Sequence, residues 1–229
     1  MSDDKYQFKK KSYYLKLLLL KDELNYFHEM LLLEVKDTAS WIIMLRNTRQ
    51  IFVVLNNVLE AANKTTIRDP EEYVDKTRRL RKTLLFTNHI RNKAAGHYDD
   101  TLLERAVQWT PTLFSSEHKG NEEFQIMEGQ RAIVETSINS FLDEEYIQKV
   151  FKAAIDLMYP PDFDLFYEYI WKVVTEALDW LTLSLSILSP AIKYYDQEEM
   201  NEVSIIAGQT EFNLKKQSKY YYNDDVFKK

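Results

Sequence analysis

A chain of 229 residues with 45% hydrophobic residues is long enough for one sizeable core and short for two ordinary domains. Four glycines and five prolines are too few for a turn-rich β architecture, so the composition predicts an all-α helical bundle. The absence of cysteine excludes a disulfide scaffold, a thiolate metal site and a cysteine nucleophile, and it fits a reducing cytoplasm.

Two apolar runs bear on a membrane or secretory segment. Residues 17–20 are four leucines bounded by charged residues, and the longest candidate, residues 180–192, has thirteen residues including three serines and a proline. A bilayer span needs about twenty apolar residues, and a signal peptide needs a longer apolar core than four. We therefore expect a soluble, cytoplasmic protein with no membrane segment.

Three helices are predicted in the first hundred residues. Leucines and aromatic residues at intervals of three and four predict a helix over residues 12–35, and a second should begin at Thr38 or Ser40. Asp69, as a cap before Pro70, should start a third helix that ends near Lys93 or Ala95. Gly96 would stop it by taking the left-handed conformation.

The chain should then turn and form further helices. Thr101 and Glu104 have the spacing of a capping box. Residues 115–129 turn polar around their glycines, and we favour an insertion over residues 115–140 with a small β-hairpin near residues 120–138. A helix continuing over residues 131–141 is the alternative.

The last third of the chain is expected to hold two helices. One should run over residues 143–158 and end at Pro160, and a longer one over residues 164–188 should end before Pro190. Its aromatic residues predict core or dimer-interface positions. Residues 1–229 would form a single domain with a charged tail at 211–229, either a last short helix or a frayed end.

Charge is unevenly distributed. The net charge is −6, which is unusual for a generic nucleic-acid binder. Between residues 76 and 98, however, there are seven basic residues, two histidines and no Asp or Glu, and the rest of the chain then holds 23 Lys and Arg against 36 Asp and Glu. The basic residues of this segment are Lys76, Arg78, Arg79, Arg81, Lys82, Arg91 and Lys93. An RNA-binding face is one interpretation of Arg78, Arg79, Arg81, Lys82 and Lys93, and a solvated helix face is the other.

The same segment ends in RNKAAGHYDD, which places Arg91 and His97 around the predicted helix end. Arginine offers a planar fork of donors to phosphate oxygens, and histidine transfers protons near neutral pH. Together they could support metal-independent RNA cleavage by attack of a ribose 2′-hydroxyl on the adjacent phosphate. The structural alternative is that both residues only donate hydrogen bonds to the last carbonyl groups of the helix.

Arg91 is followed by the polar residue Asn92, and five residues separate Arg91 from His97. This pattern resembles the signature of the HEPN superfamily. The resemblance implies an all-α bundle, a homodimer whose motifs face each other, and ribonuclease activity in toxin–antitoxin, defence or RNA-processing systems, with an antitoxin protein as a further partner. It implies that His97 acts as acid or base, Arg91 binds the scissile phosphate and Asn92 orients one of them. Tyr98 directly follows the histidine, whereas toxins with a nucleotidyltransferase antitoxin have their tyrosine one residue later.

Other chemistries lack a pattern. The glycines are too widely spaced for a phosphate loop, GxSxG is absent, and the histidines form neither HxxH nor HExxH, so neither a metal nor a cofactor is expected. His89, two residues before Arg91, could line the same region, and a core or surface role is the favoured interpretation. The leading hypothesis is a HEPN-like endoribonuclease; the alternatives are an inactive HEPN-like module that binds RNA or a protein, and a helical scaffold with a coincidental motif.

Overall fold

The computed structural model describes residues 2–208 of the chain. The chain divides into two compact units, residues 1–191 and residues 192–229, and each is described by itself. The first unit is an all-α bundle, as the composition predicts, and no strand occurs within the described residues. None of the described helices has the length and apolar character needed to cross a membrane.

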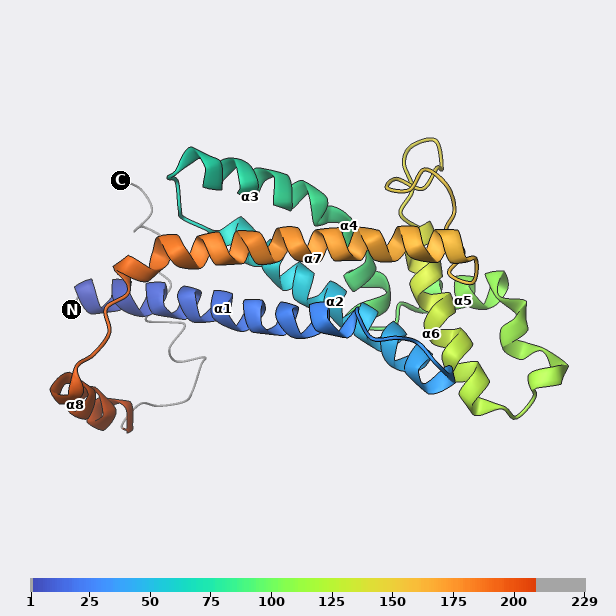
Figure 1. Cartoon of the computed structure of the whole chain (residues 1–229), viewed down its shortest axis with the longest axis horizontal. Helices are drawn as coiled ribbons and strands as arrows, with labels where there is room; N and C mark the ends of the chain where they lie inside the picture. Colours follow the sequence, from blue (N-terminus) through green and yellow to red (C-terminus); the bar gives the residue numbers. More distant parts are fainter. Residues whose placement is uncertain (1, 209–229) are drawn as a thin grey trace. The chain divides into compact units, whose positions relative to one another are not determined.

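Seven α-helices and four short helical turns build the first unit, and the second contributes one described helix (Figure 1). In chain order the elements are α1 (Ser2–Met30), α2 (Thr38–Lys64), α3 (Glu71–Thr83), α4 (Leu85–Ile90), the π turn η1 (Arg91–Ala95), α5 (Asp100–Trp109), the 3-10 turns η2 (Pro111–Phe114) and η3 (Ser116–His118), α6 (Glu122–Asn139), α7 (Pro160–Leu188), η4 (Ser189–Ala191) and α8 (Gln197–Gly208). The charged tail predicted at residues 211–229 lies outside the described residues.

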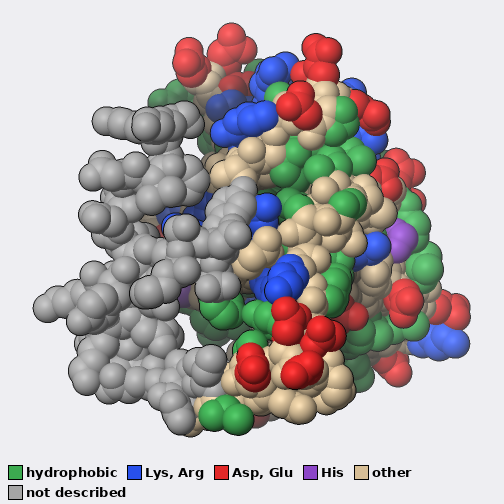
Figure 2. Space-filling view, turned by 90° about the vertical axis from the view of Figure 1, so that its left-hand side faces the viewer, with side chains coloured by type: hydrophobic (Ala, Val, Ile, Leu, Met, Phe, Trp, Pro, Cys, Tyr) green, Lys and Arg blue, Asp and Glu red, His purple; other side chains and the backbone are tan. Residues whose placement is uncertain are grey.

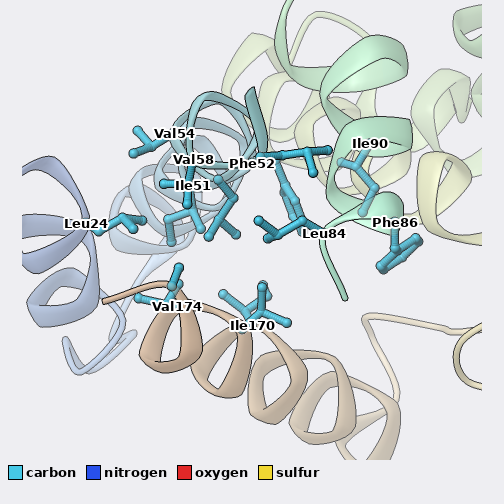
Figure 3. Close-up of a cluster of buried hydrophobic side chains, with 14 of the residues drawn as sticks. Leu24, Ile51, Phe52, Val54, Val58, Leu84, Phe86, Ile90, Ile170 and Val174 are labelled. Atoms are coloured by element: carbon cyan, nitrogen blue, oxygen red, sulfur yellow. The ribbon is translucent and has the colours of Figure 1, made fainter. Parts of the chain in front are cut away.

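Helix α2 is the centre of the bundle. It packs against α1, α3, α4, η1, α6 and α7. Its start at Thr38 confirms the prediction and has a clear local cause: Asp37 Oδ1 accepts from the backbone N of Ser40 at 2.7 Å, and Ser40 Oγ accepts from the backbone N of Asp37 at 2.9 Å. Figure 3 shows its apolar side chains meeting those of α1, α4 and α7. The labelled residues are Leu24, Ile51, Phe52, Val54, Val58, Leu84, Phe86, Ile90, Ile170 and Val174.

Helix α7 confirms the long aromatic helix predicted over residues 164–188, although it begins earlier, at Pro160. Proline has no backbone N–H, and at the first helical position that group would have no partner within the helix. Pro160 therefore starts a helix here instead of ending one. Trp180 is 1% exposed and donates from Nε1 to Thr77 Oγ1 at 2.9 Å. The late aromatics therefore include core residues with satisfied polar atoms.

The prediction of a helix over residues 143–158 is wrong, because these residues form a loop. The Asp143 carboxylate accepts from the backbone N of Glu145 and of Ile147, and Leu142 and Gln148 form an isolated antiparallel bridge. Tyr146 has a positive φ of 61° within this turn. An aspartate that hydrogen-bonds the backbone ahead of it competes with helix formation, which explains the loop.

The third predicted helix is interrupted. It is capped by Pro70, one residue after the predicted Asp69, and it breaks at Leu84 into α3, α4 and η1. The predicted end at Ala95 is confirmed. Helix α5 is capped by Asp99, whose Oδ1 accepts from the backbone N of Leu102 at 2.9 Å, and not by the predicted Thr101 pair.

The β-hairpin predicted near residues 120–138 is also wrong, because these residues form α6, which packs on α2 and α5. Two ion pairs at helical spacing explain the difference. Arg131 Nη2 lies 2.7 Å from Glu128 Oε2, and Arg131 Nη1 lies 2.6 Å from Glu135 Oε2. Residues three and four apart are neighbours on the surface of a helix, so these pairs favour the helix, and here they are largely buried.

Removing Arg131 should therefore be costly. Arg131→Ala leaves the carboxylates of Glu128 and Glu135 without their buried cation, and we expect the free energy of unfolding to fall by about 3–5 kcal/mol. Urea denaturation followed by circular dichroism measures this loss. The matched change Arg105→Ala removes an exposed arginine of α5 and should alter stability by less than about 0.5 kcal/mol. Equal effects of the two substitutions would contradict a stabilising role for the buried cluster.

Candidate functional site

The segment Arg91–His97 begins in a widened helical turn. After α4 ends at Ile90, the backbone N of Gly96 donates to the carbonyl O of Arg91 at 2.7 Å, a bond spanning five residues. Such π turns are rare and occur frequently at functional sites. The side chain of Ala94 is buried beneath the turn, so the outer surface of the segment is set by its longer side chains.

Gly96 has a structural role, but not the predicted one. Its φ of −77° and ψ of −30° are right-handed, so the expected left-handed helix stop is wrong. The space here is tight instead: a Cβ would lie 3.2 Å from Arg91 Nε, 3.2 Å from the carbonyl O of Arg91 and 3.3 Å from Arg91 Cζ, so a side chain would require Arg91 to shift by a few tenths of an ångström. The guanidinium of Arg91 thus lies directly against the residue that precedes His97.

Asn92 fixes the direction of Arg91. Arg91 Nη1 donates to Asn92 Oδ1 at 3.0 Å, and Asn92 Nδ2 donates to Asn88 Oδ1 at 3.1 Å. The Nε of Arg91 is buried without a hydrogen-bond partner. An unsatisfied donor of this kind costs about 1–3 kcal/mol, so this placement of Arg91 does not maximise stability.

His97 is exposed, and Arg91 is half-buried. Neither side chain is therefore enclosed in the core, so burial does not exclude a shared site. The neighbouring charge is partly compensated, because Lys93 Nζ lies 2.8 Å from Asp99 Oδ2. The hydrogen bond from Lys93 lowers the pKa of the Asp99 carboxyl, and the charge of His97 contributes in the same direction. Lys93, predicted to contact RNA, thus already has an ion pair.

Arg49 of α2 is a residue of this site that sequence reasoning missed. Its Nε donates to the carbonyl O of Ala94 at 2.6 Å, and its Nη1 donates to Tyr98 Oη at 3.0 Å and to Gln130 Oε1 at 2.9 Å. The hydrogen bond from Arg49 lowers the pKa of the Tyr98 phenol, and the charge of Arg46 adds to this effect. One feature of the sequence could have pointed to Arg49. It lies three residues after Arg46 on α2, and residues 38–59 contain no acidic residue to neutralise the two arginines.

The basic side chains of α3 lie beside acidic residues that are outside the basic segment, residues 76–98, of the sequence. Arg78 pairs with Asp75 at 2.8 Å, and Lys76 pairs with Glu72 at 2.9 Å. Arg79 lines a hollow of about 230 Å³ together with Glu176 and Asp179 of α7, whereas Lys82 is exposed. Figure 2 shows one face of the molecule on which acidic and basic side chains lie among one another. The run of basic residues in the sequence is thus not matched by a basic surface of α3 alone.

Arg81 has a structural contact at the C-terminal end of α2. Its Nε donates to the carbonyl O of Ala62 at 3.1 Å, and its Nη2 donates to the same oxygen. Arg49 contacts η1 from a position 13 residues earlier on α2, which corresponds to about 20 Å along the helix. The structure thus does not bring Arg81 together with the segment around Arg91.

The remaining histidines have packing contacts. His89 is half-buried, its Nε2 lies 2.9 Å from Ser140 Oγ, and burial lowers the pKa of its imidazole. His28 lies against Trp171, with ring centroids 3.8 Å apart. Over residues 2–208, no group of three or more His, Asp or Glu side chains is arranged to hold a metal ion.

Comparisons of this chain with protein-family models, with curated proteins and with solved structures found no match. The functional argument therefore depends on the residues described above.

The contact between Arg49 and Tyr98 generates a prediction. Arg49→Met removes both the hydrogen bond and the charge, so the pKa of Tyr98 should rise toward about 10, the ordinary value of a tyrosine phenol. NMR titration of protein labelled at tyrosine ¹³Cζ, with Tyr98→Phe for assignment, measures it. Arg46→Met removes a more weakly acting charge and should give a smaller rise. An unchanged pKa in the Arg49 variant would show that this contact is absent in solution.

Proposed function

We propose that the segment Arg91–Tyr98 is a phosphate-binding site for RNA and that the protein is a HEPN-like, metal-independent endoribonuclease. The observation that carries the proposal is the placement of the Arg91 guanidinium against Gly96, oriented by Asn92 and followed immediately by the exposed His97. These placements support the expectation from the sequence motif that Arg91 and His97 serve one site.

The cost of placing Arg91 supports a functional interpretation. Its Nε is buried without a partner, and its Nη1 bonds the side chain of the next residue instead of an acidic group. Positions where local structure departs from the most stable arrangement are frequent at functional sites. A phosphate oxygen would be a stronger partner for a guanidinium than an amide, because both groups are charged.

In the proposed reaction, a base takes the proton of a ribose 2′-hydroxyl, the 2′-oxygen attacks the adjacent phosphorus, and the bond to the 5′-oxygen breaks. An acid gives a proton to that leaving 5′-oxygen, and the product carries a 2′,3′-cyclic phosphate. His97 serves as the acid or the base, Arg91 stabilises the charge of the phosphorane, and Arg46 and Arg49 add positive potential nearby. One copy supplies half of the acid–base pair, so a homodimer would supply the second histidine.

Cleavage of end-labelled RNA in EDTA tests the proposal. We expect cyclic-phosphate products from the wild type. His97→Ala should lower the rate by about 10²–10⁴-fold because a proton-transfer group is lost. Arg91→Ala should lower it by about 10²–10³-fold because charge stabilisation is lost. Arg91→Lys keeps the charge but loses the planar fork and should recover part of the rate.

Arg105→Ala and His118→Ala, which remove residues of the same types from positions outside the segment, should leave the rate unchanged. Retained RNA binding without cleavage would replace the enzyme with an inactive RNA-binding module. Cleavage that survives both His97→Ala and Arg91→Ala would assign the activity elsewhere or to a contaminant and would overturn the proposed site.

A further inference from the structure

The loop that joins α6 to α7, residues 140–159, lines a hollow that the proposed ribonuclease site does not use. The loop holds no helix and one isolated bridge. Figure 1 shows it extending from the end of α6 and returning to the start of α7. Ordered loops longer than about 12–15 residues are uncommon in compact domains and usually have a function.

Hydrogen bonds from two amide side chains fix the loop. Asn139 Nδ2 donates to the carbonyl O of Ile155 at 2.8 Å, and Asn139 Oδ1 accepts from the backbone N of Ile155 at 2.8 Å. Gln148 is buried; its Nε2 donates to the carbonyl O of Ile138 at 3.2 Å, and its Oε1 accepts from the backbone N of Val150 at 2.7 Å. The loop is therefore a preformed wall, which lowers the entropic cost of binding a ligand.

The hollow lies between this loop, α6 and the end of α5, and it has a volume of about 650 Å³. Its walls are mostly apolar, and they include two aromatic residues, Trp109 of α5 and Tyr146 of the loop, which are 55% and 84% exposed. The other apolar lining residues are Leu142, Ile147, Ala153, Ala154 and Ile155. Sites for small molecules are typically hollows of about 300–1,000 Å³ with apolar and aromatic walls and a few polar groups.

The charged residues that line the hollow are both acidic. They are Glu135 of α6 and Asp156 of the loop, and no lysine or arginine of residues 2–208 lines it. Glu135 Oε2 accepts from Arg131 Nη1 at 2.6 Å and from the backbone N of Leu157 at 3.0 Å, and Asp156 Oδ1 accepts from the backbone N of Met158 at 2.8 Å. The second oxygen of each carboxylate, Glu135 Oε1 and Asp156 Oδ2, accepts no hydrogen bond from the described part of the chain.

Arg131 does not neutralise this group of carboxylates. It pairs with Glu128 as well as with Glu135, so three carboxylates including Asp156 stand against one guanidinium and leave a net charge of −2. Burial raises the pKa of the Glu135 carboxyl, and the charge of Asp156 acts in the same direction. The carboxylates of Glu135 and Asp156 therefore repel each other, and a cation bound between them would relieve this repulsion.

The lysines of the loop do not supply that cation. Lys152 Nζ lies 3.6 Å from Asp143 Oδ2, and Lys149 Nζ lies 5.5 Å from the centroid of the Phe141 ring. Neither lysine lines the hollow. A cation in the hollow therefore has to come from outside this loop.

We propose that the hollow binds an aliphatic amine of the diamine or polyamine class. One ammonium group meets Glu135 Oε1 and another meets Asp156 Oδ2, because hydrogen bonds between charged groups are the strong ones. The methylene chain lies against Trp109 and Tyr146, and an ammonium group near either ring gains a cation–π attraction. A neutral apolar molecule would cover the carboxylates without pairing them, which favours the charged ligand.

This site is separate from the proposed ribonuclease site. None of residues 91–98 lines the hollow. Amine binding can therefore be measured without RNA, and a failure of either proposal leaves the other standing.

Titration of the full-length protein with 1,5-diaminopentane, followed by ¹H–¹⁵N NMR, tests the proposal. The indole N–H signal of Trp109, assigned by its loss in Trp109→Leu, should shift with a dissociation constant of roughly 1 mM. The diol 1,5-pentanediol has a chain of the same length without charge and should produce no shift at the same concentration. Equal shifts with the diol would overturn the proposal in favour of a neutral ligand. The absence of any shift at ~20 mM diamine would overturn it outright.

Asp156→Asn removes the charge and keeps an oxygen that can accept from the backbone N of Met158. The dissociation constant should rise about threefold because one ion pair is lost. Asp143→Asn is the matched control, since Asp143 Oδ1 also accepts from the backbone N two residues later, that of Glu145 at 3.1 Å, yet does not line the hollow. It should leave the affinity unchanged. Equal effects of the two substitutions would reveal only a general attraction of cations to an acidic chain and would overturn the site.

Trp109→Leu keeps an apolar side chain but removes the aromatic ring. Followed through the backbone amide signals of residues 153–156, it should weaken diamine binding about two- to fivefold. Phe114→Leu, at a 69% exposed aromatic residue outside the hollow, should have no effect. A lysine blocked at both its amino and carboxyl groups is the last arm of the test. If it bound more tightly than the diamine, the occupant would be a basic peptide and the proposal of a small amine would be wrong.

Discussion

The burial of α2 is the constraint on which the rest of the first unit depends. Six other elements pack on it, and its residues Ile51, Leu55 and Val58 are completely buried. The same helix presents polar contacts toward both of its ends: Arg49 donates to the carbonyl of Ala94, and the carbonyl of Ala62 accepts from Arg81. Because apolar contacts hold α2 in place, the hydrogen bonds of these arginines attach η1 and α3 to a buried helix. The geometry around Arg91 is thus set by the core and not by the local sequence alone.

The basic segment shows how far linear charge patterns can mislead. Residues 76–98 contain no acid, yet acids immediately outside the window and on α7 lie beside several of its cations. Conversely, Arg49 lies 45 residues before Ala94 in the sequence and still contacts its carbonyl. The arginines at the candidate site therefore come from two elements, Arg49 from α2 and Arg91 from η1. Only tertiary packing shows this, because a sequence window compares neighbours along the chain and a surface potential sums over neighbours in space.

Local signals predicted the elements that have local causes. The start of α2 could be predicted because Ser40 bonds back to its cap, and the class of fold followed from sparse glycine and proline. The predictions for residues 143–158 and 120–138 were wrong because in each segment two arrangements of similar local preference compete, a helix and a loop in the first and a helix and a hairpin in the second. For the candidate site, Arg91, Asn92 and His97 could be singled out from their spacing. The contribution of Arg49 could not, since it is a contact across the folded chain. The close approach of Arg91 to Gly96 could not either, since it depends on the widened turn and on where the Arg91 side chain lies.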